Sequence, residues 1–171
     1  MCIRDRMQAV AYGETTSVGG VDVRLVPAGH VLGSAQVVVS RNGLIMTVSG
    51  DYKRRRDPTC VPFELSPCHV FISEATFGLP VFVHPPDADE IDRLMRSLAQ
   101  FPDRAHLIGA YALGKAQRII CLLRERGWER PIYVHGALER LNELYQASGV
   151  GLGALRPATG LNPGALGGEV V

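Results

Sequence analysis

Apolar and polar positions alternate along the first third of the chain in the way that is typical of half-buried β-strands. Two such runs, 15–18 and 21–26, are separated by Gly19-Gly20. A Gly-Gly pair between two alternating runs favours a tight turn and an antiparallel hairpin. The pattern therefore predicts a β-like run at residues 9–12, a turn at Gly13 and then a β-hairpin.

A second pair of apolar runs, 35–40 and 44–48, is joined by Asn42-Gly43. Both turn residues tolerate positive φ, so this pair predicts a second hairpin. His30 precedes the first of these strands, and Asp51 follows the second. Because an antiparallel pair joined at its tip brings its outer ends together, we expect the two side chains to lie close to each other.

The next segment, residues 52–69, is expected to be irregular. It contains the basic run Lys53-Arg54-Arg55-Arg56 and three prolines, which block regular strand pairing. The short apolar run 70–73 follows and predicts a buried strand that ends at Glu74.

The periodicity becomes helical after a proline-rich linker at residues 79–86. We expect helices over residues 87–100, 114–126 and 138–147 and strands over residues 106–110 and 131–134. This alternation is typical of an α/β layer with parallel strands. The tail from residue 149 onward is rich in Gly, Pro and Ala without periodicity, so we expect it to be irregular.

Composition narrows the classes of protein that the chain can represent. Its 171 residues are 46% hydrophobic and 20% charged, which excludes a disordered or fibrous chain. No apolar run is long enough to span a membrane, and residues 1–6 do not resemble a signal peptide, so we expect a cytoplasmic protein with no membrane partner. We interpret residues 1–6 as a non-native scar before Met7. The net charge of +1 gives no indication of nucleic-acid binding.

The four cysteines contain no Cys-x-x-Cys pair and are interpreted as free thiols. An alternative is that Cys60 and Cys68 bind zinc, although their spacing matches no common structural zinc site.

Three residues that can bind a metal or move a proton follow apolar runs: His30, Asp51 and Glu74. Each also has a structural interpretation: a lone histidine is more often structural than a ligand, and an aspartate after Ser-Gly commonly caps a turn. A carboxylate such as that of Glu74, at the end of a core strand, is costly unless it is paired or bound to a metal. Together the three suit a divalent ion that activates water, but one histidine and one aspartate are too few ligands for a complete catalytic zinc site.

Four segments carry a resemblance to a known family. They are Pro27-Ala-Gly-His30-Val-Leu-Gly-Ser-Ala35, Val48-Ser-Gly-Asp51-Tyr52, Ile72-Ser-Glu74-Ala-Thr-Phe-Gly78 and Ala110-Tyr-Ala-Leu-Gly114-Lys115-Ala-Gln117-Arg118. They resemble, in order, two metal motifs of the metallo-β-lactamase fold and two motifs of its nucleic-acid-cleaving β-CASP branch. The likeness covers about residues 7–150 and is strongest to the bacterial DNA ligase-associated exonuclease family.

This resemblance implies an α/β protein. Residues 7–79 would form a partial metallo-β-lactamase αββα sandwich, residues 80–150 part of a β-CASP α/β domain, and residues 151–171 an irregular tail. It also implies two divalent metal ions, zinc with manganese as the alternative.

The resemblance also implies a role for each matching residue. His30 would bind one metal ion, Asp51 would bridge both ions, and Glu74 would support the metal site and its proton traffic. Lys115 and Arg118 would bind the nucleic-acid backbone, although a solvated helix face explains these two residues equally well.

The His-x-His-x-Asp-His motif of the family is absent from the sequence, as are its later histidine motifs. We therefore interpret the chain as a fragment that is inactive alone. The parent is expected to be a metal-dependent DNA exonuclease that works in repair beside an ATP-dependent DNA ligase.

Three alternatives remain open. They are an RNA-processing β-CASP ribonuclease, a non-catalytic fragment that binds nucleic acid, and a hydrolase of small thioesters or lactams. The Glu74 motif and the helix that begins near Lys115 argue against the last of these.

Overall fold

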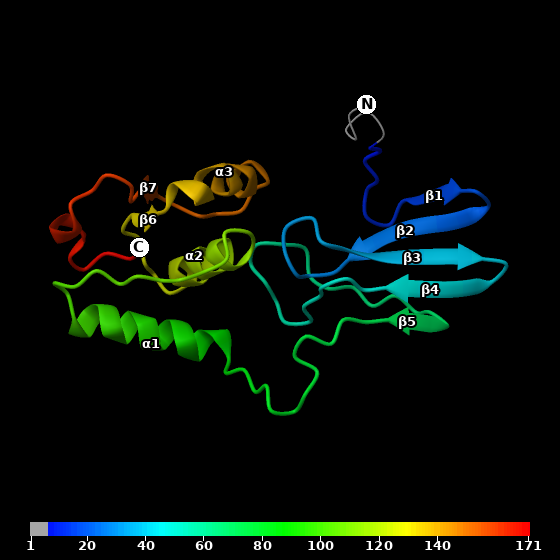
Figure 1. The fold of residues 1–171 in the computed structure, drawn as a ribbon, viewed down its shortest axis with the longest axis horizontal. Helices are drawn as coiled ribbons and strands as arrows, with labels where there is room; N and C mark the ends of the chain where they lie inside the picture. The colour runs from blue at the N-terminus through cyan, green and yellow to red at the C-terminus, as the bar shows by residue number, and fades with distance from the viewer. Residues whose placement is uncertain (1–6) are drawn as a thin grey trace. The chain divides into compact units, whose positions relative to one another are not determined.

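The computed structural model describes residues 7–171, so the scar expected at residues 1–6 lies outside the described residues. The chain divides between Gly78 and Leu79 into two compact units, called unit 1 and unit 2. The strands and helices of each unit are labelled in Figure 1. In residues 7–171, no helix combines the length and the apolar character that crossing a bilayer requires.

Unit 1 is built on one sheet of five strands in the order β1-β2-β3-β4-β5. The strands are β1 (Thr15–Val18), β2 (Val21–Pro27), β3 (Ala35–Arg41), β4 (Leu44–Val48) and β5 (Val70–Ile72). Neighbouring strands are antiparallel from β1 to β4, whereas β5 pairs in parallel with β4.

Both predicted hairpins are confirmed. Gly19 and Gly20 have φ of 60° and 77° between β1 and β2, and Asn42 and Gly43 have φ of 51° and 81° between β3 and β4. Positive φ at both central residues matches the twist of the flanking strands, which is why these dipeptides fix the register so well.

The prediction of a buried strand at residues 70–73 is wrong with respect to burial. Strand β5 forms, but Val70, Phe71 and Ile72 are 41%, 47% and 50% exposed. The strand lies at the edge of the sheet, and the described residues of unit 1 contain no helix that covers its faces. An apolar run reports the tendency to form a strand and does not report what covers it.

Unit 2 combines three helices with a two-stranded parallel sheet in the described part of the chain. Its elements are α1 (Asp87–Gln100), α2 (Lys115–Glu125), β6 (Ile132–Val134), η2 (Gly136–Leu138), α3 (Glu139–Ala147), β7 (Leu155–Pro157) and η3 (Pro163–Leu166). The three predicted helices and the strand at residues 131–134 are confirmed within one or two residues, with the start of the third helix formed by η2.

Local sequence explains where the helices begin and end. Helix α1 follows Pro86 and carries acidic residues in its first turn, where the helix dipole favours negative charge. Helix α2 begins after Gly114, whose φ is 81°, and the chain turns away at Gly127, whose φ is 83°. Glycine is suited to both positions because it has no Cβ to oppose a positive φ.

Two parts of unit 2 differ from the predictions. Residues 106–110 form no named strand. Instead the N–H of His106 donates to the carbonyl of Glu169, and the N–H of Ile108 donates to the carbonyl of Val171. The tail after residue 150 is not irregular throughout, because β7 pairs with β6 and both Leu152 and Val170 are buried. These pairings join distant parts of the chain, so local composition cannot indicate them.

Arg124 holds part of this tail in place. Its guanidinium donates to the carbonyls of Leu152 (2.9 Å) and Ala154 (2.8 Å) and to those of Trp128 (2.5 Å) and Arg130 (2.6 Å). One side chain on α2 therefore satisfies four carbonyl groups in the segments that precede β6 and β7.

Candidate functional site

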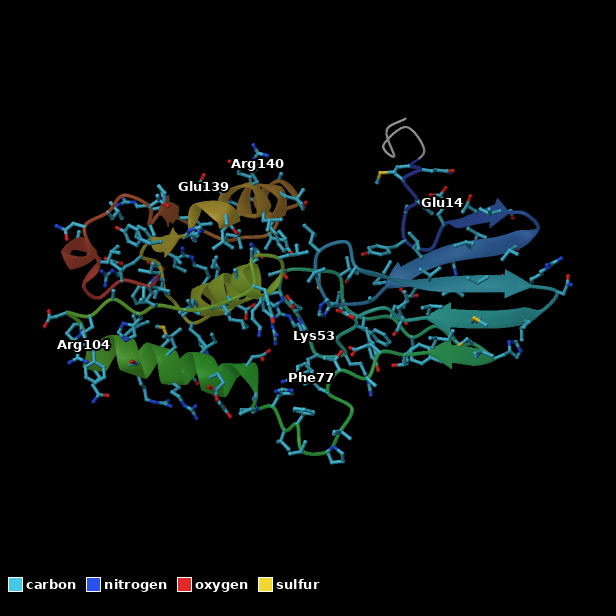
Figure 2. The ribbon with its side chains drawn as sticks, in the orientation of Figure 1. Glu14, Lys53, Phe77, Arg104, Glu139 and Arg140 are labelled. Atoms are coloured by element: carbon cyan, nitrogen blue, oxygen red, sulfur yellow. The ribbon has the colours of Figure 1, made fainter. Side chains whose placement is uncertain are left out.

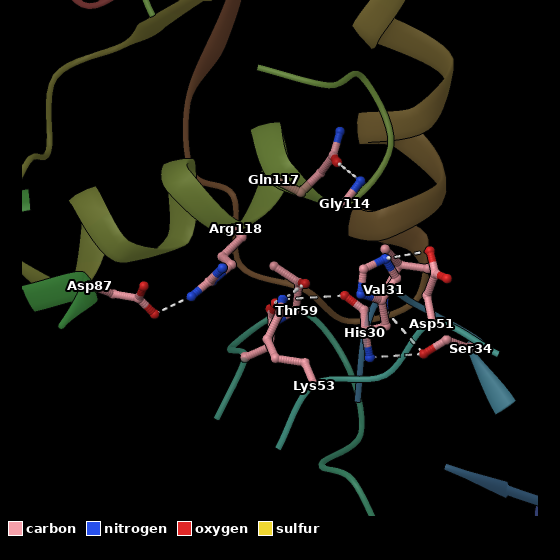
Figure 3. Close-up of polar contacts among 11 residues, drawn as sticks. His30, Val31, Ser34, Asp51, Lys53, Thr59, Asp87, Gly114, Gln117 and Arg118 are labelled. Atoms are coloured by element: carbon pink, nitrogen blue, oxygen red, sulfur yellow. Dashed lines mark hydrogen bonds and ion pairs between the residues drawn. The ribbon is translucent and has the colours of Figure 1, made fainter. Parts of the chain in front are cut away.

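The loop between β2 and β3 holds His30 through a serine. The hydroxyl oxygen of Ser34 accepts from the N–H groups of His30 (3.0 Å) and Val31 (3.1 Å), and the N–H of Ala28 donates to the Ser34 carbonyl (3.1 Å). These bonds close the Gly-His-Val-Leu-Gly segment into a fixed turn, with His30 partly exposed on it (Figure 3).

Gly29 is required next to His30. Its φ is +67°, and a Cβ there would lie 2.6 Å from the carbonyl oxygen of Lys53 and 2.7 Å from the backbone nitrogen of Phe63. Both contacts are with backbone atoms, which cannot rotate away. Gly29 thus lets the His30 loop lie directly against the segment that follows β4.

Asp51 lies next to His30, as the hairpin geometry predicts. The distance between His30 Nε2 and Asp51 Oδ2 is 3.7 Å, and the two side chains are 39% and 70% exposed. Figure 3 shows the imidazole and the carboxylate facing each other. The pair is open to solvent, so an additional ligand or ion can reach it.

Glu74 follows β5 and is tied to the end of β4 through Ser49. The N–H of Ser49 donates to the Ile72 carbonyl (2.9 Å), and the buried Ser49 hydroxyl accepts from the N–H of Glu74 (3.4 Å). The carboxylate of Glu74 accepts from the N–H of Thr76 at 2.9 Å.

The pKa of the Glu74 carboxyl is lowered, first by hydrogen bonds from the backbone and side chain of Thr76. Desolvation opposes this shift, while the N–H of Tyr52 and the charge of His30 lower the pKa further. Glu74 is thus near enough to His30 to respond to its charge. The structure therefore gathers all three residues singled out in unit 1 at one end of the sheet.

A partly buried ion pair supports this end of the sheet and was not singled out from the sequence. Lys53 Nζ lies 2.5 Å from Asp57 Oδ2 and 3.4 Å from the carbonyl oxygen of His30. The other carboxylate oxygen of Asp57 accepts from the N–H (3.0 Å) and hydroxyl (2.6 Å) of Thr59. The N–H of Lys53 also donates to the Ala28 carbonyl at 3.0 Å.

Burial by itself raises the pKa of the Asp57 carboxyl, but the hydrogen bonds from Lys53 and Thr59 outweigh this effect and leave the pKa below its ordinary value. Asp57 is 4% exposed. The signal in the sequence was an acidic residue within a basic and proline-rich segment, Arg56-Asp57-Pro58-Thr59, where an Asx-type turn is common.

The donor set fits part of a metal site. Two ligands of one ion at about 2.1 Å each can be 3.7 Å apart, so the separation of His30 and Asp51 suits a shared ion. Within residues 7–171, however, no three His, Cys, Asp or Glu side chains are grouped closely enough to hold an ion. The described residues thus supply two donors rather than a closed site.

The remaining candidates of unit 1 gain no support as ligands. Cys60 and Cys68 are half-buried free thiols, and neither belongs to a metal-binding group among the described residues. His69 Nδ1 accepts from the N–H of Ile45 at 3.0 Å, which is a structural role beside β4.

In unit 2, the two expected nucleic-acid contacts differ in their surroundings. The guanidinium of Arg118 pairs with the carboxylate of Asp87, and the Arg118 side chain is only 17% exposed (Figure 3). Lys115 is exposed, and its ammonium lies 5.6 Å from the centroid of the Tyr111 ring. Lys115 is therefore the better placed of the two to contact a ligand from solvent.

Curated proteins similar to this chain are mainly named as ribonucleases. The chain is 32% identical over 146 residues to "Endoribonuclease ysh1" of Aspergillus fumigatus. This alignment covers 78% of this chain and 16% of the Aspergillus protein. The chain is 30% identical over 148 residues to "Probable DNA ligase" of Opitutus terrae, with 81% and 14% covered. It is 26% identical over 147 residues to "RNase aCSPSF2" of Saccharolobus solfataricus, with 82% and 29% covered.

A solved structure supports the fold alone. The "Protein of Unknown Function from Enterococcus faecalis V583" aligns with a TM-score of 0.58 at 15% identity and covers 96% of this chain and 41% of that chain. No protein-family model matches the sequence.

These similarities support the resemblance to β-CASP nucleases, without selecting the ligase-associated exonuclease family. The names favour the RNA alternative over the DNA exonuclease that the sequence led us to expect. The chain spans only 16% of the length of the Aspergillus protein and 14% of the length of the Opitutus protein.

Proposed function

We propose that this chain is part of a β-CASP nuclease of the metallo-β-lactamase fold that hydrolyses phosphodiester bonds in RNA. The observation that carries the proposal is the approach of His30 and Asp51 to 3.7 Å at an exposed end of the sheet, with Glu74 beside them. The similarity to proteins named as ribonucleases supports RNA as the substrate. Residues 7–79 would be a partial metallo-β-lactamase domain, and residues 80–150 part of a β-CASP domain, in a cytoplasmic protein.

The chain's own residues would perform distinct tasks in the site. His30 would bind one of two divalent ions, zinc or manganese, and the exposed carboxylate of Asp51 would bridge both. When bound, such a pair of ions supplies an activated water and neutralises charge on the phosphate. Two donors are fewer than a catalytic ion takes, so the remaining ligands would come from outside residues 7–171.

Glu74 would act beside the ligands as an ionised carboxylate. Its pKa is already lowered by Thr76, Tyr52 and His30, so it carries negative charge at neutral pH. This negative charge attracts cations to the site. Glu74 would also accept protons from water that enters at this end of the sheet.

Ser34, Gly29 and the Lys53–Asp57 pair would position these groups. They hold the His30 loop against the segment after β4 through contacts with backbone atoms of the loop. In unit 2, Lys115 would contact the nucleic-acid backbone, and Arg118 would do so only by giving up Asp87.

A second candidate is a DNA exonuclease that works beside an ATP-dependent DNA ligase. One observation favours it, the 30% identity to a protein named as a probable DNA ligase. A third candidate is a fragment that binds nucleic acid without cutting it, which the incomplete donor set favours.

The test compares RNA and DNA cleavage by a longer protein that contains this chain. End-labelled single strands of the same sequence are incubated with zinc or manganese. We expect RNA to be cleaved, and we expect Asp51→Ala and His30→Ala to abolish cleavage. Asp103→Ala and His84→Ala are matched controls on exposed residues of unit 2 and should keep full activity.

The 171-residue chain itself is expected to bind divalent ions weakly and to cleave neither substrate. Cleavage of DNA but not RNA by the longer protein would replace the first candidate with the second. Full activity in His30→Ala would remove His30 from the ligand set.

A further inference from the structure

Tyr111 combines strong exposure with an adjacent positive charge. Its ring is 78% exposed, and Lys115 Nζ lies 5.6 Å from the ring centroid. An aromatic ring buries a large apolar area when it is covered, so leaving it in water forgoes stabilisation. We infer that Tyr111 and Lys115 form a platform on which a base of single-stranded nucleic acid stacks, with the ammonium bound to a neighbouring phosphate.

The inference rests on the proposed function for the choice of nucleic acid as the ligand. It adds Tyr111 as a residue that would contact a base, whereas the residues proposed so far contact metal ions or phosphate. It is carried by unit 2 alone and uses neither His30 nor Asp51. Lys115 was expected from the sequence as a backbone contact, whereas Tyr111 had no assigned role.

The segment that carries Tyr111 is held in one conformation by a buried glutamine. The Gln117 side chain accepts from the N–H of Gly114 (2.8 Å) and donates to the carbonyl of Ala112 (3.0 Å), as Figure 3 shows for Gly114. The carbonyl of Tyr111 also accepts from the N–H of Ala116 at 3.2 Å. The turn before α2 is therefore fixed at both ends.

Gln117 is itself fixed from another helix. Its amide nitrogen donates to Asn142 Oδ1 on α3 at 2.8 Å, and the two side chains are 0% and 2% exposed. The three hydrogen bonds of the Gln117 side chain therefore tie the turn before α2 to helix α3. The Tyr111 ring thus projects from an ordered turn, and less conformational entropy is lost when a ligand stacks on it.

The chemistry of the pair fits a single strand of nucleic acid. Every base has an aromatic face, so stacking on an exposed ring tolerates any sequence. A lysine ammonium binds phosphate as a point charge, and that of Lys115 lies 5.6 Å from the ring centroid. In a duplex the base faces are stacked on each other and cannot reach the ring, which makes the single strand the fitting partner.

Unit 2 also contains a matched pair that serves as a control. Arg104, labelled in Figure 2, lies 5.0 Å from the centroid of the Phe101 ring, and Phe101 is 37% exposed. This pair follows the C-terminal end of α1 and has no counterpart of the Gln117 network among the hydrogen bonds described for residues 101–104. It also places a cation beside an aromatic ring, but the Phe101 ring is less than half as exposed as the Tyr111 ring.

The test measures binding without metal, so that it is separate from hydrolysis. Single-stranded oligonucleotides that contain 2-aminopurine are titrated with the chain in EDTA, and both anisotropy and base fluorescence are recorded. We expect Tyr111→Ala to weaken binding roughly tenfold and to remove the quenching of 2-aminopurine, whereas Tyr111→Phe keeps both. Phe101→Ala should bind as the unchanged chain does.

Two further arms separate stacking from charge. On an abasic strand with the same number of phosphates, Tyr111→Ala should bind as the unchanged chain does, whereas Lys115→Gln should bind more weakly. RNA and DNA strands should show the same loss in Tyr111→Ala, because stacking does not use the 2′-hydroxyl group.

Four results would overturn the inference: unchanged binding in Tyr111→Ala, equal weakening on the abasic strand, equal weakening by Phe101→Ala, or a loss confined to one sugar. Trp128 fluorescence in each variant reports whether unit 2 is folded. If Tyr111→Ala unfolds, Tyr111→Phe still tests the inference, because the phenylalanine ring must quench 2-aminopurine as the tyrosine ring does. If the longer protein stacks a base on Tyr111 but cleaves no nucleic acid, this inference holds and the proposed activity is wrong. If it cleaves RNA but shows no stacking on Tyr111, the proposed activity holds and this inference is wrong.

Discussion

The two units of the chain bury different kinds of residue. Among the described residues, unit 1 buries few apolar side chains, which are Val26, Pro27, Ala28 and Val38, and several polar ones, which are Gln36, Thr47, Ser49, Asp57 and Thr59. Unit 2 buries a larger apolar set, which includes Ile91, Leu98, Ile120, Leu123, Trp128, Ile132, Tyr145, Leu152 and Val170. Unit 1 is therefore held around its site by hydrogen bonds, and unit 2 by apolar contacts.

This contrast has consequences for function. The candidate metal ligands in unit 1 are exposed and lie on a polar support, so their replacement should change binding without unfolding the unit. The platform in unit 2 depends on a turn that is anchored to an apolar interior through Gln117. Its function should therefore fail when the interior is disturbed.

The largest effect is expected in the interior of unit 2. Leu123 is 0% exposed, and Leu123→Ala should lower the free energy of unfolding by about 2–5 kcal/mol, because it removes apolar contacts and leaves a cavity. Trp128, the single tryptophan of the chain, reports this unit in a denaturant titration. Leu107→Ala, at a residue that is 79% exposed, should change little. A small effect at Leu123 would contradict an apolar interior.

The next largest effect is expected at the polar support of unit 1. Asp57→Ala leaves the Lys53 ammonium and the Thr59 donors without their acceptor and should destabilise unit 1 by about 3 kcal/mol. Amide hydrogen exchange at Thr59 should accelerate, while the Trp128 transition stays unchanged. Asp51→Ala, at a side chain that is 70% exposed, is the control and should leave the exchange rate as it was.

The same carboxylate predicts a dependence on pH. The pKa of Asp57 is lower in the folded state than the usual unfolded value of about 3.9, so its stabilising contribution is complete above that value. The contribution is lost as the pH falls further, through the folded pKa. Thr59 exchange protection should therefore decrease in acid in the unchanged chain. In Asp57→Asn this decrease should be smaller, and an equal decrease would assign the effect to other groups.

The smallest effect is expected at the exposed edge strand. Ile72 is 50% exposed on β5, so Ile72→Thr should change the free energy of unfolding by no more than about 0.5 kcal/mol. Denaturation followed by hydrogen exchange at Ser49, whose N–H bonds the Ile72 carbonyl, measures it. A loss of about 2 kcal/mol would mean that β5 is covered in solution.

Local sequence signals predicted much of the fold. Asn42-Gly43 determined a hairpin, and with it the approach of His30 to Asp51. Apolar periodicity determined α1 and α2, because the side chains on one face of a helix are set by spacing alone.

The rest depends on contacts between distant residues. The sequence does not indicate that Arg118 pairs with Asp87, or that the tail pairs with His106. The segment that contains Asp57 and its partners Lys53 and Thr59 has no apolar periodicity, so nothing in the sequence indicated that Asp57 is buried. Exposure of β5 depends on what lies beside it, which an apolar run cannot report.

A zinc titration followed by NMR of the histidine side chains tests the proposed site most directly. We expect the His30 imidazole signals to shift on zinc addition, and Asp51→Ala to weaken the affinity by roughly tenfold or more, because the carboxylate 3.7 Å away is the second ligand of the same ion. His84→Ala should leave the titration unchanged. Shifts confined to other histidines, or the same affinity in Asp51→Ala, would contradict a shared ion at His30 and Asp51.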